Sequence, residues 1–244
     1  MDNIQLLALG LYGFFMGLER AGIRSVNMPV IPFVISALGP MTAMGYMLPI
    51  VLITDIFSVT YYRRSADIRI LLHTLPGAFL GIVTGTLVGQ RLSVPLFKGL
   101  VGCIIIVSLC FIIYNEAGKK SLVRPDRALF PGLVFAYFTG LASMLGASGS
   151  PVILSYLLML NIGKEKLIGT SAFFFLFVNL VKLPMYIFVW KNLNMASFLT
   201  DLMLLPVMGL GLAIGFFLVR KFNTQNYRKF IIAVSFVSAV RLFF

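Results

Sequence analysis

Charged residues are scarce in this chain. They make up 11% of its 244 residues, against about 25% in typical soluble domains, while hydrophobic residues make up 59%. A soluble chain of this size cannot cover its surface with so few charges, so an ordinary soluble fold is excluded. The same composition excludes a disordered chain.

Residues that bind metals or form disulfides are also few. The chain has one histidine and two cysteines, and Cys103 and Cys110 lie in a single apolar run. No set of side chains has the spacing of a metal site, and no nucleophile or phosphate loop stands at a motif spacing. We therefore expect a protein that is not an enzyme and that uses no cofactor or metal.

Long apolar stretches make up most of the sequence. They lie at 4–38, 41–62, 70–89, 95–114, 128–161, 167–190, 198–219 and 227–244. Most of them have the length of one tilted membrane span. We predict an all-α polytopic membrane protein with about eight apolar segments and 8–10 helices, integral to the bacterial plasma (inner) membrane.

Two stretches, 4–38 and 128–161, are too long for one span. As single helices they would measure roughly 50 Å, well beyond a hydrocarbon core of about 30 Å. Each is interrupted near its middle by small or polar residues before a proline, Pro29 in the first and Pro151 in the second. Because proline fits the first turn of a new helix, we interpret both stretches as broken helices or helical hairpins, either re-entrant or two full spans.

The two halves of the chain share a spaced set of residues. The offset between matching residues drifts slowly from 122 to 131 in the pairs Gly17 and Gly140, Pro29 and Pro151, Gly45 and Gly169, Asp55 and Asn179, Pro76 and Pro206, Gly81 and Gly211, Gly85 and Gly215, Arg91 and Lys221, and Lys98 and Lys229. Conserved order and a near-constant offset favour an internal duplication. We predict a first membrane repeat at 1–114, a basic cytoplasmic linker at 115–127 and a second membrane repeat at 128–244.

Basic residues indicate how the halves are oriented. If the linker is cytoplasmic and the segment 128–161 doubles back, 13 Lys and Arg residues in the loops lie inside and three outside, and the 191–197 loop is outside. This bias gives the halves opposite orientations, which is the inverted-repeat plan of secondary transporters. The same bias explains the net charge of +12, because the basic residues in the loops set the orientation of the chain and face anionic lipid headgroups. We therefore expect the lipid bilayer as a partner, and no nucleic acid.

The breaks contain side chains that suit an anion. A helix that starts anew presents unpaired N–H groups with a partial positive charge, and the arginine fork donates two parallel hydrogen bonds to an oxyanion. As alternatives, the serines cap their own helices and the arginines snorkel to an interface. The candidate substrate-binding residues are Arg20, Arg24, Ser25, Asn27, Gly146, Ser148, Gly149 and Ser150.

A second candidate set concerns coupling. Asp55 lies mid-span, its repeat counterpart is Asn179, and Lys182 follows Asn179 by about one helical turn. We predict an Asp55–Lys182 ion pair, which would be either a structural clamp or a proton-coupling element. Glu19 would neutralise Arg20 or carry a proton.

The pattern of two apolar halves, each opening with a break and a proline, around a basic linker resembles the sulfite exporter TauE/SafE family. The residues that carry the resemblance are Gly146-Ala147-Ser148-Gly149-Ser150-Pro151, Gly169-Thr170-Ser171, Leu75-Pro76-Gly77, Gly81 and Gly85. The resemblance implies export or uptake of a small sulfur-containing anion, such as sulfite or an organosulfonate.

From the residues alone, we predict a secondary transporter of a small anion that works by alternating access. H⁺ and Na⁺ are both candidate coupling ions, and the direction of transport and the oligomeric state stay open. The alternative from another class is an anion channel or a structural membrane subunit.

Overall fold

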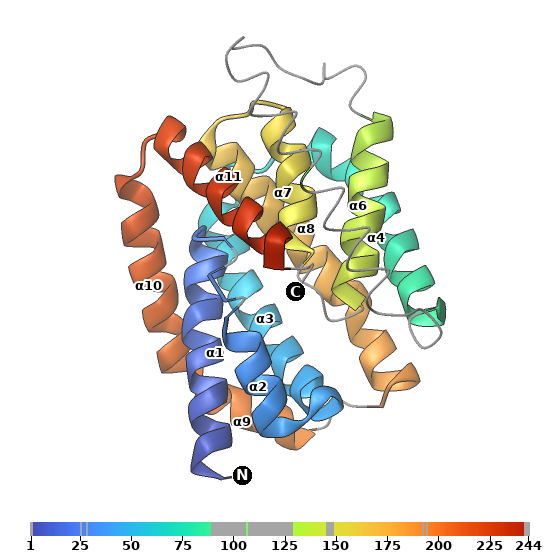
Figure 1. Cartoon of the computed structure of the whole chain (residues 1–244), viewed down its shortest axis with the longest axis vertical. Coiled ribbons are helices and arrows are strands. Elements are labelled where there is room, and N and C mark those ends of the chain that lie inside the picture. The colour runs from blue at the N-terminus through green and yellow to red at the C-terminus, as the bar shows by residue number, and fades with distance from the viewer. Residues whose placement is uncertain are drawn as a thin grey trace. The chain divides into compact units, whose positions relative to one another are not determined.

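The computed structural model describes residues 2–24, 26, 27, 29–88, 106, 129–144, 149–191, 193 and 195–241, and these contain no strand. Its helices are α1 (Asn3–Ala21), α2 (Val30–Leu38), α3 (Pro40–Tyr62), α4 (Ile68–Val88), α6 (Leu129–Met144), α7 (Ser150–Met159), α8 (Lys164–Pro184), the π-helix η2 (Met185–Val189), α9 (Met195–Met203), α10 (Leu205–Lys221) and α11 (Thr224–Arg241) (Figure 1). The predicted linker at 115–127 and both cysteines lie outside the described residues.

Three segments are long and apolar enough to cross a membrane. They are Thr42–Tyr62, Ile68–Leu87 and Lys164–Val189, and the shorter helices α6 and α7 are apolar as well. The protein is therefore a helical membrane protein. The predicted number of eight apolar segments stays a prediction, because the stretch at 95–114 lies almost wholly outside the described residues.

The first overlong stretch is interrupted where the sequence predicts it. Helix α1 ends at Ala21, and Gly22 follows with a φ of 125°, a conformation that costs glycine little. Helix α2 begins after Pro29 and has nine residues. At 1.5 Å per residue it is roughly 14 Å long, about half of a hydrocarbon core, so α2 is too short to be a full span.

The second overlong stretch is interrupted in the same way. Helix α6 ends at Met144, and α7 begins at Ser150 with Pro151 in its first turn. Helix α7 has ten residues and is again about half as long as a full span. The lengths of α2 and α7 favour the re-entrant interpretation of both breaks.

The stretch at 198–219 differs from its prediction as a single span. Helix α9 ends at Met203, and α10 starts afresh at Leu205 with Pro206 in its first turn. Proline has no N–H to donate and its ring clashes with the carbonyl four residues earlier, so a break at this place follows from Pro206. Its repeat counterpart Pro76 lies within the continuous helix α4, which is why the repeat pattern did not predict the break.

The described helices form two compact units. The first comprises Met1–Tyr61 and Phe175–Phe222, and the second comprises Tyr62–Phe174 and Asn223–Phe244. Each unit combines a segment from the first half of the chain with a segment from the second half. These units are defined by contacts and do not coincide with the repeats at 1–114 and 128–244, whose boundaries stay a prediction.

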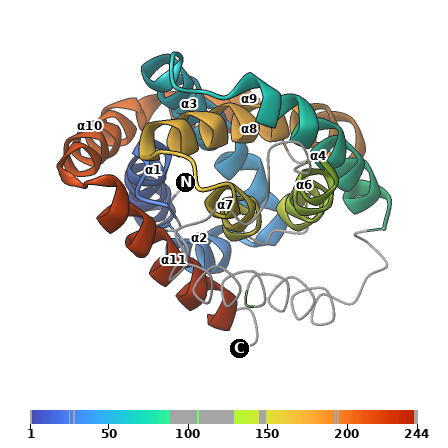
Figure 2. The ribbon, with the colours of Figure 1, turned by 90° about the horizontal axis from the view of Figure 1, so that it is seen from above.

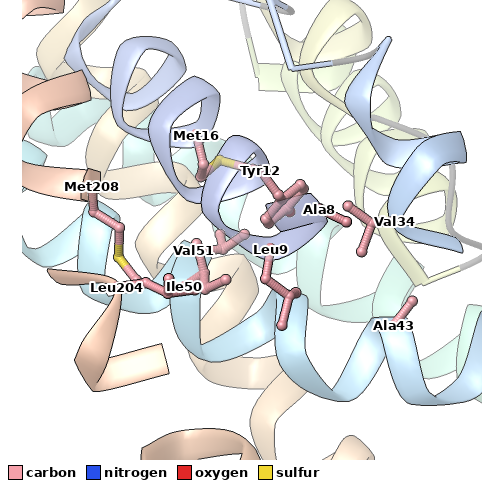
Figure 3. Packing of buried hydrophobic residues seen from close by; sticks show 10 residues of the cluster. All are labelled: Ala8, Leu9, Tyr12, Met16, Val34, Ala43, Ile50, Val51, Leu204 and Met208. Atoms are coloured by element: carbon pink, nitrogen blue, oxygen red, sulfur yellow. The ribbon is translucent and has the colours of Figure 1, made fainter. Parts of the chain in front are cut away.

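The apolar core of the first unit surrounds one face of α1. Ala8, Leu9, Tyr12 and Met16 recur at the helical period and are buried. They pack with residues of α2, α3 and the α9–α10 junction, namely Val34, Ala43, Ile50, Val51, Leu204 and Met208 (Figure 3).

Glycines allow α1 and α10 to cross closely in the first unit (Figure 1). A Cβ atom on Gly17 would lie 2.5 Å from the carbonyl oxygen of Met208, and one on Gly211 would collide with the carbonyl oxygen of Phe14. Only a residue without a side chain fits at such a backbone-to-backbone contact. The two helices therefore pack with their main chains in contact.

The second unit has a crossing of the same kind between α4 and α6, which lie side by side in Figure 2. A Cβ atom on Gly81 would collide with the carbonyl oxygen of Tyr137, and one on Gly140 with that of Ala78. Close contact through small residues is typical of membrane helices, where van der Waals packing drives association.

The loop before α4 joins that helix to the start of α8, also within the second unit. Asp67 Oδ1 accepts hydrogen bonds from the backbone N–H groups of Arg69 and Ile70, and Lys166 Nζ lies 3.2 Å from Asp67 Oδ2. Partial burial acts to raise the pKa of Asp67, but the hydrogen bonds from Lys166 and Ile70 outweigh it and hold the pKa below its ordinary value. A Cβ atom on Gly169 would lie 2.9 Å from Ser65 in this loop, so the glycine leaves room for it.

Candidate anion site at the first helix break

The first break gathers polar side chains in the interior of the first unit. They come from the end of α1, the break itself, α3 and the second part of α8, and they are Glu19, Arg20, Arg24, Asn27, Asp55, Ser58, Asn179 and Lys182. Arg20 is 5% exposed and Arg24 is 1% exposed. The interpretation that these arginines snorkel to an interface is therefore wrong, because both are enclosed by protein.

Asp55 of α3 is the centre of this cluster. Arg20 Nε of α1 lies 2.8 Å from Asp55 Oδ1, as a close ion pair without hydrogen-bond geometry. Asn179 Nδ2 of α8 donates a hydrogen bond of 2.7 Å to Asp55 Oδ2. Ser58 Oγ, one turn further along α3, donates a hydrogen bond of 2.6 Å to the carbonyl oxygen of Arg20. These contacts hold the end of α1 against α3 and α8.

The partner of Asp55 differs from the one that we predicted. The ion pair of Asp55 among the described residues is with Arg20, whereas the repeat pattern indicated Lys182. The Lys182 ammonium lies 5.4 Å from the centre of the Tyr186 ring, and its electrostatic interaction with Asp55 is weaker than that with Arg20. The prediction compared counterparts across the repeat, but tertiary packing brings the end of α1 closer to α3.

One aromatic ring lies close to both arginines. The guanidinium carbon of Arg20 is 4.8 Å from the centre of the Phe175 ring, and that of Arg24 is 5.5 Å from it. Both distances are within the range of a cation–π interaction. Phe175, on α8, therefore supports two positive charges close together in the interior.

Asn27 has a buried polar side chain that no other described residue hydrogen-bonds. Its backbone N–H donates to Glu19 Oε2 at 3.4 Å, which fixes the break segment. Its carboxamide is fully buried, and neither Oδ1 nor Nδ2 has a hydrogen-bond partner among the described residues. The Nη1 atom of Arg20 is buried without a hydrogen-bond partner in the same way.

The charges of the cluster do not balance. Arg20, Arg24 and Lys182 carry three positive charges, and Glu19 and Asp55 carry two negative ones, all on buried side chains. Asp55 interacts electrostatically with both arginines and with Glu19, and Lys182 interacts with Arg20. Among the described buried residues, one positive charge is thus in excess, and the cluster is chemically suited to a small anion.

Comparison with known proteins identifies the family. The profile described as Sulfite exporter TauE/SafE matches residues 6–242 of the chain. The chain belongs to this family. Neither the comparison with curated proteins nor that with solved structures gives a match. Membership of TauE/SafE makes the protein an integral membrane transporter rather than an enzyme, and it confirms the resemblance predicted from the breaks and glycine motifs.

The second break of this TauE/SafE protein is described only in part. Ser25 of the first break and Gly146 and Ser148 of the second lie outside the described residues. Gly149 and Ser150 belong to the second unit, where a Cβ atom on Gly149 would lie 2.7 Å from the carbonyl oxygen of Thr139. Gly149 therefore has a packing role against α6, and the convergence of both breaks on one anion stays a prediction.

Neither described short helix has serine as its N-cap residue, and self-capping by Ser25 or Ser148, which lie outside the described residues, stays an alternative. The N-cap residue of α2 is Pro29 and that of α7 is Gly149, and neither makes a side-chain cap hydrogen bond in this part of the chain. Ser150 lies one position inside α7. Its role as a substrate contact stays a prediction.

Two buried residues of this TauE/SafE protein escaped the sequence analysis. Phe175 has no signal in a single sequence, because a phenylalanine in an apolar stretch is ordinary. Asp201 of α9 is 0% exposed, and its signal was visible, since it is an aspartate within the apolar stretch 198–219.

Proposed function

We propose that this TauE/SafE protein is a secondary transporter that moves a small sulfur oxyanion or organosulfonate across the plasma membrane by alternating access. The anion binds at the first break, on Arg20, Arg24 and Asn27. The observation that carries this proposal is the buried carboxamide of Asn27, whose polar atoms have no partner among the described residues, beside a cluster with one positive charge in excess.

The chemistry of an oxyanion fits these groups. Its oxygens accept hydrogen bonds from guanidinium and amide N–H groups, and charge-assisted bonds of this kind are about twice as strong as neutral ones. Asp55 and Phe175 hold Arg20 in place, so little side-chain entropy is lost when an anion binds. A bound anion also offsets the surplus charge, which is costly at membrane depth.

The helix boundaries support the proposed duplication. Helix α3 begins at Pro40 and α8 at Lys164, an offset of 124. This offset agrees with those of the sequence pairs.

The two glycine crossings give independent support for the duplication. Gly17 meets Met208 and Leu212 across the α1–α10 crossing, and its counterpart Gly140 meets Ala78 and Ile82 across the α4–α6 crossing. Met208 and Leu212 follow Ala78 and Ile82 by the same 130 residues that separate the prolines and glycines of these helices.

The reverse contacts correspond as well. Gly211 meets Phe14 and Gly81 meets Tyr137, while Gly215 meets Leu18 and Ala21 and Gly85 meets Leu141 and Met144. Each residue of α6 follows its counterpart in α1 by 123. Two crossings made by equivalent residues are the expected result of a duplicated gene segment, and inverted halves are the plan of many secondary transporters.

The experiment compares anion affinity and stability in Asn27→Ala. Removing a buried amide that has no partner among the described residues should leave the free energy of unfolding close to that of wild type. The loss of an anion contact should weaken affinity by roughly tenfold, the equivalent of about 1.4 kcal/mol. Affinity for sulfite, thiosulfate, sulfate and methanesulfonate is measured on purified protein, and saturable flux of the same anions is measured in proteoliposomes.

Ser36→Ala is the matched control, because Ser36 is an exposed residue of α2 in the same unit whose hydroxyl donates only to a neighbouring carbonyl. Arg24→Lys keeps the charge and loses the fork, so it also weakens binding. If folded Asn27→Ala and Arg24→Lys bind every anion as tightly as wild type does, the first break is not the binding site. Flux that does not saturate would instead indicate a channel.

A further inference from the structure

Asp201 is a buried acid that the anion cluster does not use. It lies in α9 of the first unit, is 0% exposed, and neither of its carboxylate oxygens has a hydrogen-bond partner among the described residues. Every other acidic side chain buried in this unit has a partner: Asp55 has Arg20 and Asn179, and Glu19 has the backbone of Asn27. Asp201 is therefore the exception that requires a physical explanation.

No counter-charge among the described residues explains why Asp201 is buried. Helix α10 packs against α9, and its charged residues, Arg220 and Lys221, lie in its last turn. Fifteen residues of helix separate Leu205 from Arg220, roughly 22 Å. No charged side chain of the described residues contributes an electrostatic interaction to Asp201, and Asp201 contributes none to Asp55 or Lys182.

An ionised carboxylate that is buried without a counter-charge or a hydrogen-bond donor is strongly unfavourable. The neutral acid has no such penalty, because protonation removes the charge. In the conformation described here, the neutral, protonated form of Asp201 is therefore favoured over the carboxylate.

We propose that Asp201 binds the proton that accompanies the anion during transport. The inference rests on the proposed transport function and names its coupling ion. When the site opens to water on one side, the carboxylate takes a proton from a hydronium ion and releases water. When it opens on the other side, the O–H bond breaks and the proton passes to water. The closed conformation is reached only by the protonated carboxyl group, so each passage through it carries one proton.

A proton suits this site better than a metal cation does. Hard cations take six or more oxygen ligands, or keep several waters. The described residues contain no group of three or more His, Cys, Asp or Glu side chains that could hold a metal ion, and they offer neither carboxylate oxygen of Asp201 a hydrogen-bond partner. A single carboxyl group is sufficient for a proton.

The position in the chain indicates where the proton enters. Asp201 lies close to the 191–197 loop, which the positive-inside bias places outside. The acid is thus near the outer end of its apolar stretch, and we expect it to exchange protons with the outer solution.

The test measures proton and anion movement together. Wild type, Asp201→Asn and Asp2→Asn are reconstituted into proteoliposomes with a pH-sensitive dye trapped inside. Methanesulfonate and thiosulfate are the anions, because both are anions of strong acids and carry no proton themselves. We expect proton movement with the anion in wild type and in Asp2→Asn, whose altered residue is exposed in the same unit. Asp201→Asn should exchange anion across the membrane while its proton flux falls at least tenfold.

A second measurement uses the wild-type protein only. Dicyclohexylcarbodiimide reacts with protonated carboxyl groups in apolar surroundings, so mass spectrometry should find it on Asp201, and labelling should stop proton-coupled flux.

The possible failures are distinguishable. If wild type moves neither anion, the proposed transport function fails. Folded Asp201→Asn with the proton flux of wild type would overturn the assignment of Asp201. A wild-type protein that forms no dicyclohexylcarbodiimide adduct on Asp201, or whose proton-coupled flux persists once Asp201 carries the adduct, would also overturn it. Flux that follows a sodium gradient and not a pH gradient would overturn it as well.

Discussion

One carboxylate organises the polar interior of the first unit. Asp55 pairs with Arg20 and accepts a hydrogen bond from Asn179, so a residue of α3 holds both the end of α1 and α8. Such an arrangement suits a binding site in which the Arg20 side chain must be held in a fixed position. Charge at membrane depth is expensive, and each buried group here either has a partner or is assigned to a ligand or a proton.

Removing one partner of the Arg20–Asp55 pair should lower the free energy of unfolding more than removing both partners does. Asp55→Asn leaves the Arg20 charge buried and uncompensated, so we expect a loss of about 3–5 kcal/mol in the free energy of unfolding. Adding Arg20→Met removes the second charge and should restore part of that loss. Thermal unfolding of both single variants and the double variant gives the coupling energy.

Lys166→Met is the control for that cycle. It breaks the ion pair with Asp67, but the Lys166 side chain is 59% exposed, so we expect a change within about 1 kcal/mol. Strictly additive losses in Asp55→Asn and Arg20→Met would mean that the buried pair has no energetic significance.

Two arrangements of helices each occur twice in the described part of the chain. The short helices α2 and α7 each follow a break and begin next to a proline. The glycine crossings α1–α10 and α4–α6 bring pairs of long helices into backbone contact. The first arrangement starts a new helix within an apolar stretch, and the second packs long helices against each other through their main chains.

Two glycines of α1 make opposite predictions. A Cβ atom on Gly10 would meet nothing within 4 Å, whereas one on Gly17 would lie 2.5 Å from the carbonyl oxygen of Met208. Gly10→Ala should raise the free energy of unfolding by up to about 1 kcal/mol, through helix propensity. Gly17→Ala should lower it by about 1–3 kcal/mol, because the helices must separate.

The same measurement on Gly140→Ala tests the duplication. Gly140 is the counterpart of Gly17 and meets the main chain of α4, so it should be destabilising to a similar degree. Thermal unfolding in detergent is sufficient for all three variants. Equal stability of Gly10→Ala and Gly17→Ala would show that the close crossing is not important for the fold.

The molecule as a whole consists of two units, each formed from both halves of the chain. Neither half can therefore complete a unit without the other. This exchange is compatible with the inverted-repeat plan, in which equivalent elements have opposite orientations in the membrane.

The orientation of the chain can be tested with single cysteines. In a protein with Cys103 and Cys110 replaced by serine, we expect Arg64→Cys to be inside and Lys191→Cys to be outside, because the positive-inside bias assigns their loops so. Both residues are exposed. A membrane-impermeant thiol reagent should label Lys191→Cys in intact cells and Arg64→Cys only after permeabilisation. Labelling of both from outside would contradict the inverted-repeat interpretation.

Composition is enough to assign the class of this protein, because hydropathy and charge can be counted without knowing how the helices pack. Few charges and long apolar stretches predicted a helical membrane protein, and the family match agrees. The breaks were also predictable, since Gly22, Pro29 and Pro151 act on the backbone within a few residues of themselves.

Which side chains contact each other could be learned only from the packing of the helices. The partner of Asp55 is Arg20, which is 35 positions away and has no repeat relation to it, and Phe175 lies beside both arginines although nothing in its surroundings in the sequence marks it. The isolation of Asp201 was equally invisible. Contacts between distant helices depend on how they cross, and a single sequence specifies that only through the sum of all its packing.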